Sequence, residues 1–264
     1  MSVFANKVVW VTGASSGIGQ EICRQIARGG GFLILSARNK ETLEQLKLEL
    51  DQSEKHLVLP LDLEQNAAFE LLANQVYKHF GQIDYLINNG GLSQRSEASE
   101  TSIDIDRRIM EINYFGNIAL TKAVLPYMQK QKRGHIITIS SIAGKFGFFL
   151  RSAYSASKHA LHGFYESLAL EEEKNGLHVT IACPGKINTP ISTNALTANG
   201  QKHGKMDHNQ ATGMPVESCV KILLAAIVAK KREVLIGNKE IKAVTLKRLF
   251  PKLFWKVIKK QKAT

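Results

Sequence analysis

The sequence predicts an α/β fold, a doubly wound parallel sheet of about seven strands with helices on both faces. Apolar, β-branched runs alternate with amphipathic stretches along the whole chain, which is the order that βαβ units require. The runs Val8–Val11 and Ile136–Ile139 are almost continuously apolar, as in strands that are buried on both faces. A glycine-rich turn follows the first run. We therefore expect a single domain with a ligand site at the carboxyl ends of its strands.

Each element is assigned from its pattern of apolar residues. The segments with the pattern of strands are Lys7–Thr12, Phe32–Ala37, His56–Pro60, Asp84–Ile87, Gly134–Ser140, Leu177–Cys183 and Glu233–Ile236. The segments with the pattern of helices are Gly17–Arg28, Lys40–Gln52, Asn66–Phe80, Ser102–Gln129, Ser152–Lys174 and Val216–Lys230. The 264 residues contain no internal repeat or low-complexity linker, so we expect one catalytic domain over residues 1–238 and an extension over 239–264. Residues 184–215 are long and polar, which suits a mobile segment over a site.

The composition is that of an ordinary globular protein, with 44% hydrophobic and 22% charged residues. Three cysteines lie far apart and form neither a disulfide framework nor a metal-ligand spacing, which is typical of a reducing compartment. His159 and His162 share a predicted helix, but no third ligand lies at a useful spacing, so we expect no metal. We find neither a signal peptide nor about 18 consecutive apolar residues, and expect a cytoplasmic protein.

The net charge of +12 is concentrated at the C-terminus. From Lys239 onward the chain has nine Lys and Arg and a single acidic residue, Glu240. Apolar residues recur there at near-helical spacing, and Pro251 should split the helix. Three binding partners of this amphipathic extension stay open as alternatives: an anionic membrane surface, the mouth of a substrate pocket, and a neighbouring subunit. Nucleic acid is not expected as a partner, because the basic residues are confined to this extension and no recognition motif accompanies them.

The turn after the first strand predicts a dinucleotide site. Its sequence runs Thr12-Gly13-Ala14-Ser15-Ser16-Gly17-Ile18-Gly19 and opens a helix. Glycines let phosphates approach the backbone and the free N–H groups of the helix N-terminus. The second strand ends at Arg38 and not at an acid, and a guanidinium can pair bidentately with a 2′-phosphate. We therefore expect NADP(H), with NAD(H) as the less favoured cofactor.

A serine, a tyrosine and a lysine predict acid–base chemistry. Ser141 ends a strand, and Tyr154 and Lys158 are four apart on a helix, so the phenol and the ammonium share one face. A cation beside a phenol lowers its pKa, and such a tyrosine can exchange a proton with a carbonyl or alcohol oxygen. Tyr-x3-Lys also occurs by chance on solvated helix faces, so the pair gains its weight from the glycine turn and the upstream serine.

These motifs together resemble the short-chain dehydrogenase/reductase family. The resemblance covers roughly residues 5–237, and it rests on the glycine turn, Asn88-Asn89-Gly90-Gly91, Asn113, Ser141, Tyr154-x3-Lys158, Pro184-Gly185 and Thr189. It implies a Rossmann-type single domain with Asn113, Ser141, Tyr154 and Lys158 as catalytic residues. The family usually has Ala where this chain has Gly90, a change that removes no functional group.

The resemblance also implies a role for each residue. Tyr154 would be the acid/base, Ser141 would orient the substrate oxygen, Lys158 would bind the nicotinamide ribose and lower the pKa of Tyr154, and Asn113 would support a water-linked proton path. Asp62 would face the adenine, Asn89 the ribose and Thr189 the carboxamide. The full set expected at the cofactor is Gly13, Ser15, Ser16, Gly17, Ile18, Gly19, Arg38, Asp62, Leu63, Asn89, Gly90, Tyr154, Lys158, Pro184, Gly185, Ile187 and Thr189.

The predicted function is hydride transfer between NADP(H) and an alcohol or carbonyl carbon of a small molecule. Segments such as 107–116 and 194–200 are similar to the branch of family member 7B, whose members are linked to membranes and lipid carbonyl substrates, so an apolar substrate is expected. Phe146, Phe148, Phe149 and Leu150 would either line its pocket or belong to the core. Leu161, Phe164 and Leu168 give the tyrosine helix an apolar stripe, and the family implies a homodimer or homotetramer. The alternative function is a catalytically silent NADP(H)-binding regulator or scaffold.

Overall fold

The computed structural model describes residues 2–261 and 263 of the chain. Within this part, seven parallel strands form one sheet in the order β3-β2-β1-β4-β5-β6-β7, which is a doubly wound Rossmann-type sheet. The strands are β1 (Val8–Thr12), β2 (Phe32–Ser36), β3 (Leu57–Val58), β4 (Tyr85–Asn88), β5 (Gly134–Ile139), β6 (Leu177–Pro184) and β7 (Glu233–Ile236). The predicted fold class is therefore confirmed.

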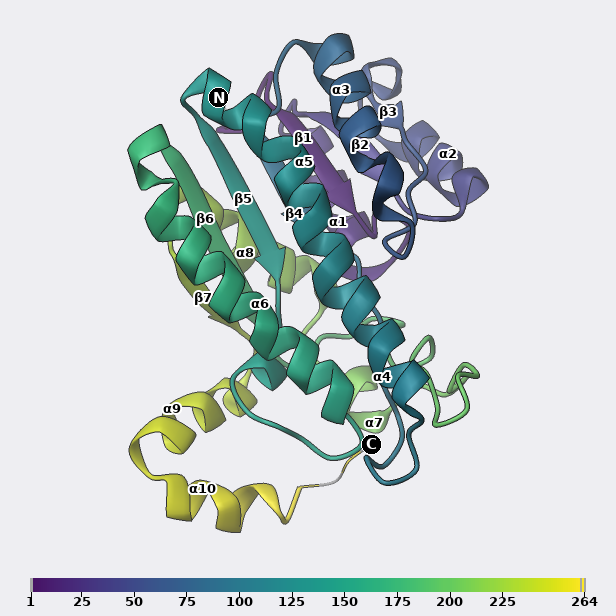
Figure 1. The fold of residues 1–264 in the computed structure, drawn as a ribbon, viewed down its shortest axis with the longest axis vertical. Helices are drawn as coiled ribbons and strands as arrows, with labels where there is room; N and C mark the ends of the chain where they lie inside the picture. The colour runs from purple at the N-terminus through teal and green to yellow at the C-terminus, as the bar shows by residue number, and fades with distance from the viewer. Residues whose placement is uncertain (1, 262, 264) are drawn as a thin grey trace.

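Two layers of helices cover the sheet (Figure 1). The main helices are α1 (Gly17–Arg28), α2 (Lys40–Glu49), α3 (Phe69–Phe80), α4 (Ile103–Met110), α5 (Gly116–Gln131), α6 (Ser152–Glu171) and α8 (Val216–Val228). Helices α1, α2 and α8 bury one face of the sheet, and α3, α5 and α6 bury the other. Because both faces are covered, the strands could be recognised as continuous apolar runs.

Apart from shifts of one to three residues at element ends, the chain departs from the predicted elements most clearly in two places. The predicted helix over Ser102–Gln129 is divided into α4 and α5 by a π-helical turn over Glu111–Phe115. The predicted third strand shrinks to Leu57–Val58, which pair with Ile34 and Leu35 of β2 at the edge of the sheet. A strand with a single neighbour has fewer ladder hydrogen bonds to extend it.

The C-terminal extension forms two short helices, α9 (Lys242–Leu249) and α10 (Pro251–Ile258). Pro251 occupies the first turn of α10, where its missing N–H costs no hydrogen bond, so the expected split falls at this residue. In Figure 1 these helices, in yellow, lie beyond the carboxyl end of β5, and the chain then returns towards α6 and α7 (His208–Ala211). Among the described residues, no helix combines the length and the apolarity needed to cross a membrane.

Candidate active site

The glycine turn between β1 and α1 leaves room for a ligand against the backbone. Gly13 and Gly17 have φ of 63° and 55°, in the left-handed region that favours glycine. A Cβ built on Gly19 would lie 2.2 Å from the carbonyl oxygen of Gly13, so a side chain there would push the helix away from the turn. These constraints fit a turn that presents its N–H groups to a dinucleotide pyrophosphate.

The loop after β4 is tied to this turn. The hydroxyl of Thr12 accepts hydrogen bonds from the backbone N–H groups of Asn89 and Gly90, both at 3.0 Å, and the Asn89 amide donates to the carbonyls of Thr12 and Gly13. A Cβ on Gly90 would lie 2.7 Å from Cδ1 of Leu63. The glycine at this position therefore lets Leu63 pack closely, and an alanine would require that leucine to move.

A cavity of about 1290 Å³ opens at the carboxyl ends of the strands. It is lined by every residue expected at the cofactor except Gly19, and by Ser141. Arg38 lies at its surface, exposed, and no ion pair involves it among the residues that the structure describes. Arg108 also lines the cavity, but two hydrogen bonds of 2.9 and 3.1 Å commit its guanidinium to Glu64. The glycine cradle therefore fits a dinucleotide, and the exposed Arg38 lines the same cavity without an ion-pair partner in the described part of the chain.

Three of the predicted catalytic side chains meet in this cavity. Ser141 follows β5, while Tyr154 and Lys158 lie on the first turns of α6, and all three are buried. Burial raises the pKa of Tyr154 above its usual value, while a hydrogen bond with the Ser141 side chain and the charges of Arg95 and Arg151 lower it by less. The Ser141 hydroxyl also accepts from the N–H of Ala143 at 3.1 Å, which fixes its position.

The ammonium of Lys158 lies between the end of β5 and the ring of Tyr154. Its ammonium donates to the carbonyl of Ile139 at 2.7 Å and lies 5.7 Å from the centre of the Tyr154 ring. Burial lowers the pKa of Lys158 to about 8. The charges that lower the pKa of Tyr154 here are those of Arg95 and Arg151, and a part for Lys158 in lowering it stays a prediction.

Asn113 lies in the π-helical turn, buried behind the other three residues. Its side-chain oxygen accepts from the N–H of Leu92 at 2.7 Å, and its amide donates to the carbonyl of Leu92 and to the hydroxyl of Ser157. The side chain thus joins the loop after β4 to α6. A π-helical turn often marks a functional position, because it breaks the regular pairing of backbone groups.

Two arginines beside the tyrosine were missed by the sequence analysis. Arg95 and Arg151 both bind the same oxygen, Oδ2 of Asp207, at 2.6 and 3.0 Å, and all three residues are largely buried. Both arginines line the cavity with Tyr154. Burial and the charge of Arg95 lower the pKa of Arg151 to about 10, and Asp207 only partly opposes this. The cluster places excess positive charge near the phenol.

The first turn of α6 is held by a buried glutamine. The side-chain oxygen of Gln94 accepts from the N–H groups of Ala153 and Tyr154 at 2.8 and 3.4 Å. It therefore satisfies donors that the start of a helix leaves open, and it fixes the backbone of Tyr154. Gln94 and Arg95 follow the Asn88–Gly91 motif within four residues, and Arg151 lies three residues before Tyr154. That proximity to recognised motifs is the signal that could have found all three.

The aromatic cluster before Tyr154 divides between pocket and surface. Phe146 and Phe148 line the cavity, but Phe149 is 44% exposed and Leu150 turns the chain with φ of 59°. Phe146 packs against Phe254 of α10, with ring centroids 5.2 Å apart, so the extension covers this side of the cavity. The sequence left three binding partners open for the extension. Its inner face contacts one of them, the mouth of the pocket.

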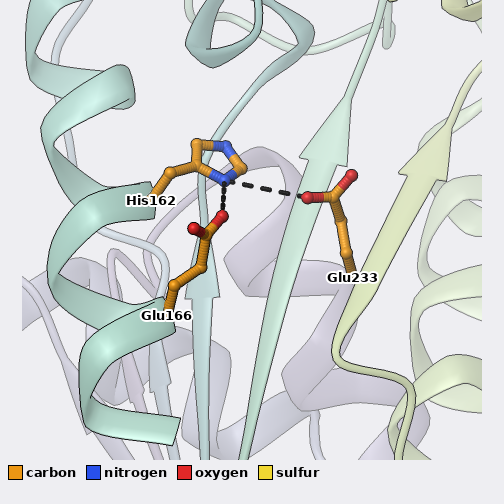
Figure 2. A group of neighbouring side chains, drawn as sticks. All are labelled: His162, Glu166 and Glu233. Atoms are coloured by element: carbon orange, nitrogen blue, oxygen red, sulfur yellow. Dashed lines mark ion pairs between the residues drawn. The ribbon is translucent and has the colours of Figure 1, made fainter. Parts of the chain in front are cut away.

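A histidine and two carboxylates meet behind the site (Figure 2). Nδ1 of His162 lies 3.5 Å from Glu166 and 3.8 Å from Glu233. The sequence analysis found no further ligand for His162, and the fold supplies two. However, the ammonium of Lys145 contacts both His162 Nδ1 and Glu233. A cation of the chain itself already pairs with Glu233 and contacts the imidazole nitrogen that a metal would need, so we assign no metal to this cluster.

The apolar stripe on α6 faces the core of its own chain. Leu161 and Leu168 pack against the sheet, and Phe164 packs beside Tyr114 of the π-helical turn. An amphipathic helix on a sheet turns its apolar stripe inward, so Leu161 and Leu168 belong to the core, and the homodimer or homotetramer stays a prediction.

Comparisons with known proteins agree with this geometry. The family model described as short chain dehydrogenase matches residues 7–200. The mouse protein named dehydrogenase/reductase SDR family member 7B is 42% identical, over 96% of this chain and 80% of the relative. The Drosophila melanogaster dehydrogenase/reductase SDR family protein 7-like is 40% identical, over 97% of this chain and 80% of the relative.

Solved structures extend the likeness to the fold. A short-chain dehydrogenase from Streptomyces avermitilis superposes with a TM-score of 0.81 and 26% identity, covering 97% of this chain and 98% of its own. A short chain dehydrogenase/reductase from Burkholderia phymatum, in complex with NAD, has a TM-score of 0.82 at 21% identity, covering 100% of this chain and 98% of its own. With both the motifs and the matched residues in agreement, this chain belongs to the short-chain dehydrogenase/reductase family.

Proposed function

We propose that the protein transfers a hydride between NADP(H) and an alcohol or carbonyl carbon of an apolar, lipid-like substrate, with Tyr154 as the acid/base. As a member of its family, the chain is an oxidoreductase that uses a nicotinamide dinucleotide. The observation that carries the proposal is that Tyr154 and Ser141, whose side chain lowers the pKa of the phenol, line the same cavity as the glycine cradle.

The residues divide the chemistry between them. The Ser141 hydroxyl, fixed by the N–H of Ala143, hydrogen-bonds the substrate oxygen and holds it beside the phenol. Because burial raises the pKa of Tyr154, the phenol carries its proton at neutral pH and can donate it to a carbonyl oxygen. The bound dinucleotide supplies the hydride. Lys158 and Asn113 position the nicotinamide end and the loop after β4.

The substrate side of the cavity supports an apolar substrate. Phe146 and Phe148 line it from the loop before α6, and Leu246 and Val257 line it from the C-terminal extension. Binding sites of this kind hold apolar groups by contact area and fix their orientation with a few polar groups. Arg95 and Arg151 are the charged groups on this side.

The test is oxidation of NADPH with a panel of long-chain ketones and aldehydes, neutral and anionic, by the wild type and Tyr154→Phe. Loss of the phenolic proton should lower kcat by about 10²–10⁴-fold while NADPH still binds. Equal turnover by the two proteins would overturn the role of Tyr154. NADPH binding without turnover of any panel member would favour the silent regulator or scaffold.

The preference for NADP(H) is tested at Arg38. Exchange of Arg38 for Asp should reduce the kcat/KM ratio of NADPH to NADH by about 10–100-fold, because a charge-assisted contact with the 2′-phosphate is replaced by repulsion. Arg28→Asp makes the same change of charge at the exposed end of α1 and should leave the ratio unchanged. An unaltered ratio in Arg38→Asp would remove the argument for NADP(H).

A further inference from the structure

The two helices of the extension have an inner and an outer face. On the inner face, Phe254 and Ile258 of α10 are 1% and 8% exposed and pack with Phe146. On the outer face lie large apolar side chains that are 42–62% exposed: Leu249, Phe250, Leu253, Trp255 and Val257. A water-soluble surface rarely gathers so many large apolar side chains within nine residues, so this outer face calls for a covering partner.

The same outer face is strongly basic. Arg248, Lys252, Lys256, Lys259 and Lys260 are all exposed between and beside its apolar residues. The single acid of the extension does not offset them, because the carboxylate of Glu240 is turned inward and accepts from the N–H groups of Lys186 and Asn238 at 2.9 and 3.1 Å. The partner must therefore be anionic as well as apolar.

Two kinds of partner fit less well. A second copy of this chain in a symmetric dimer would bring the same basic face against itself, so like charges would oppose each other. A nucleic acid would satisfy the lysines, but its phosphate backbone offers nothing to Leu249, Leu253 and Val257. An anionic lipid bilayer offers both headgroup charge and an acyl layer, and helices of this composition lie in its interface.

We propose that α9 and α10 dock this protein on an anionic lipid bilayer by their outer face, while their inner face closes the substrate cavity. In Figure 1 the two helices stand at the end of the molecule, beyond the sheet, where a flat surface can reach them. The extension is held at both ends, by Glu240 at its start and by the hydrogen bond of 2.9 Å from Arg151 to the carbonyl of Ala263.

The docking face is continuous with the cavity. Phe250 and Val257 are 60% and 42% exposed, yet both also line the cavity. A side chain that contacts the acyl layer would therefore also contact a substrate entering from it. The docking surface itself needs no turnover, so it can be tested independently of the proposed function.

The experiment measures binding of the full chain to vesicles, by flotation and by fluorescence. The probes are vesicles of phosphatidylcholine alone and vesicles with added phosphatidylglycerol. Trp255 is 51% exposed and the other tryptophan, Trp10, is fully buried, so a blue shift of emission reports on Trp255. We expect binding and a blue shift with the anionic vesicles and little of either with the neutral ones.

Two charge-matched variants decide the assignment. Reversing Lys252, Lys256 and Lys259 to Glu should weaken binding at least 100-fold, since each lysine near an anionic surface contributes about a fivefold factor. Reversing the exposed Lys78, Lys174 and Lys221 changes the net charge equally on other surfaces and should leave most of the binding. A second pair of variants tests the apolar contact. Leu253→Asp should weaken vesicle binding and remove the blue shift. Leu71→Asp, which makes the same change at a 73% exposed site of α3, should do neither.

The opposing outcomes are equally specific. Equal loss in the two triple variants would reduce the effect to net charge and overturn the proposal, as would failure of the wild type to bind anionic vesicles. A dimer that dissociates in Leu253→Asp, seen by light scattering, would assign the face to a second copy. NADPH binding and thermal unfolding of each variant show that it is folded, and the docking result stands whether or not a substrate is turned over.

Discussion

At the scale of single residues, the charges around Tyr154 differ from what its neighbours in the sequence suggest. Lys158 stands one helical turn away, but its ammonium donates to the carbonyl of Ile139. The cations that lower the pKa of the phenol are instead Arg95 and Arg151, which share one carboxylate oxygen of Asp207. Two guanidinium groups on one carboxylate leave an uncompensated positive charge, and a positive charge favours the phenolate.

Removal of Arg151 should therefore move the pH dependence of the reaction. With Arg151→Gln the pKa of Tyr154 should rise further. Alcohol oxidation requires the phenolate, so its pH profile should shift to higher pH. Carbonyl reduction requires the protonated phenol, so its activity should persist to higher pH. The check is the pH profile of kcat in both directions. Arg232→Gln, at an exposed arginine, should keep the wild-type profile, and Arg151→Lys, which retains the positive charge, should show only part of the shift. A lowered kcat with an unmoved profile would give Arg151 a purely structural role.

At the scale of elements, the C-terminal extension packs in a small hydrophobic cluster that is separate from the two large cores beside the sheet. Its helices α9 and α10 contact the body mainly through Phe254 and Ile258, which meet Phe146 and the partly buried Ile142 and Phe148. Segments with few buried apolar contacts open locally, at a lower free energy than the sheet. The cover of the cavity can therefore open without unfolding of the domain.

Truncation of Phe254 should uncouple this cover from the body. A buried Phe→Ala change removes about 3–5 kcal/mol of packing, which exceeds what so small a cluster can lose and stay docked. We expect faster hydrogen exchange over residues 242–258 in Phe254→Ala, with little change in the exchange of the β-strands. Trp255→Ala, at the exposed neighbour, should leave exchange over 242–258 near wild type. Uniformly faster exchange across the whole chain would contradict a locally opening cover.

At the scale of the whole molecule, buried histidines make stability depend on pH. His135 of β5 is buried, its Nε2 lies 2.8 Å from the hydroxyl of Thr180, and burial with the charges of His178 and Lys230 lowers its pKa to about 3. Because the folded pKa lies below the unfolded one, the unfolded chain binds more protons between about pH 6.5 and 3. Stability is therefore full above this window and falls as the pH falls through it.

The expected size follows from the same linkage. Between pH 7.5 and pH 5, His135 alone should remove about 2 kcal/mol from the free energy of unfolding, measured by urea titration at each pH. His135→Gln keeps a polar, neutral side chain and should flatten this part of the pH dependence, whereas His79→Gln, at an exposed position of α3, should not. An identical slope in His135→Gln and the wild type would place the acid sensitivity elsewhere.

The sequence by itself determined the fold and located the glycine turn at which the cavity opens. Strands that are buried on both faces have continuous apolar runs, so Val8–Val11 could be predicted as a strand from the sequence. A tight turn against a helix needs glycines at fixed spacing, so the turn with Gly13, Gly17 and Gly19 could be predicted as well. The helix over Gly17–Arg28 and the strand over Glu233–Ile236 have their predicted bounds. These signals are local, because each arises within one element and its next turn.

Only the tertiary structure decided how distant residues meet. Arg95, Arg151 and Asp207 come from three loops, and no period or spacing links them before the chain folds. The partner of the Lys158 ammonium, the inward direction of Leu161 and Leu168, and the two faces of the extension follow from packing as well. The physical reason is that charge pairing and burial depend on distances in space, which the sequence specifies only through the whole fold.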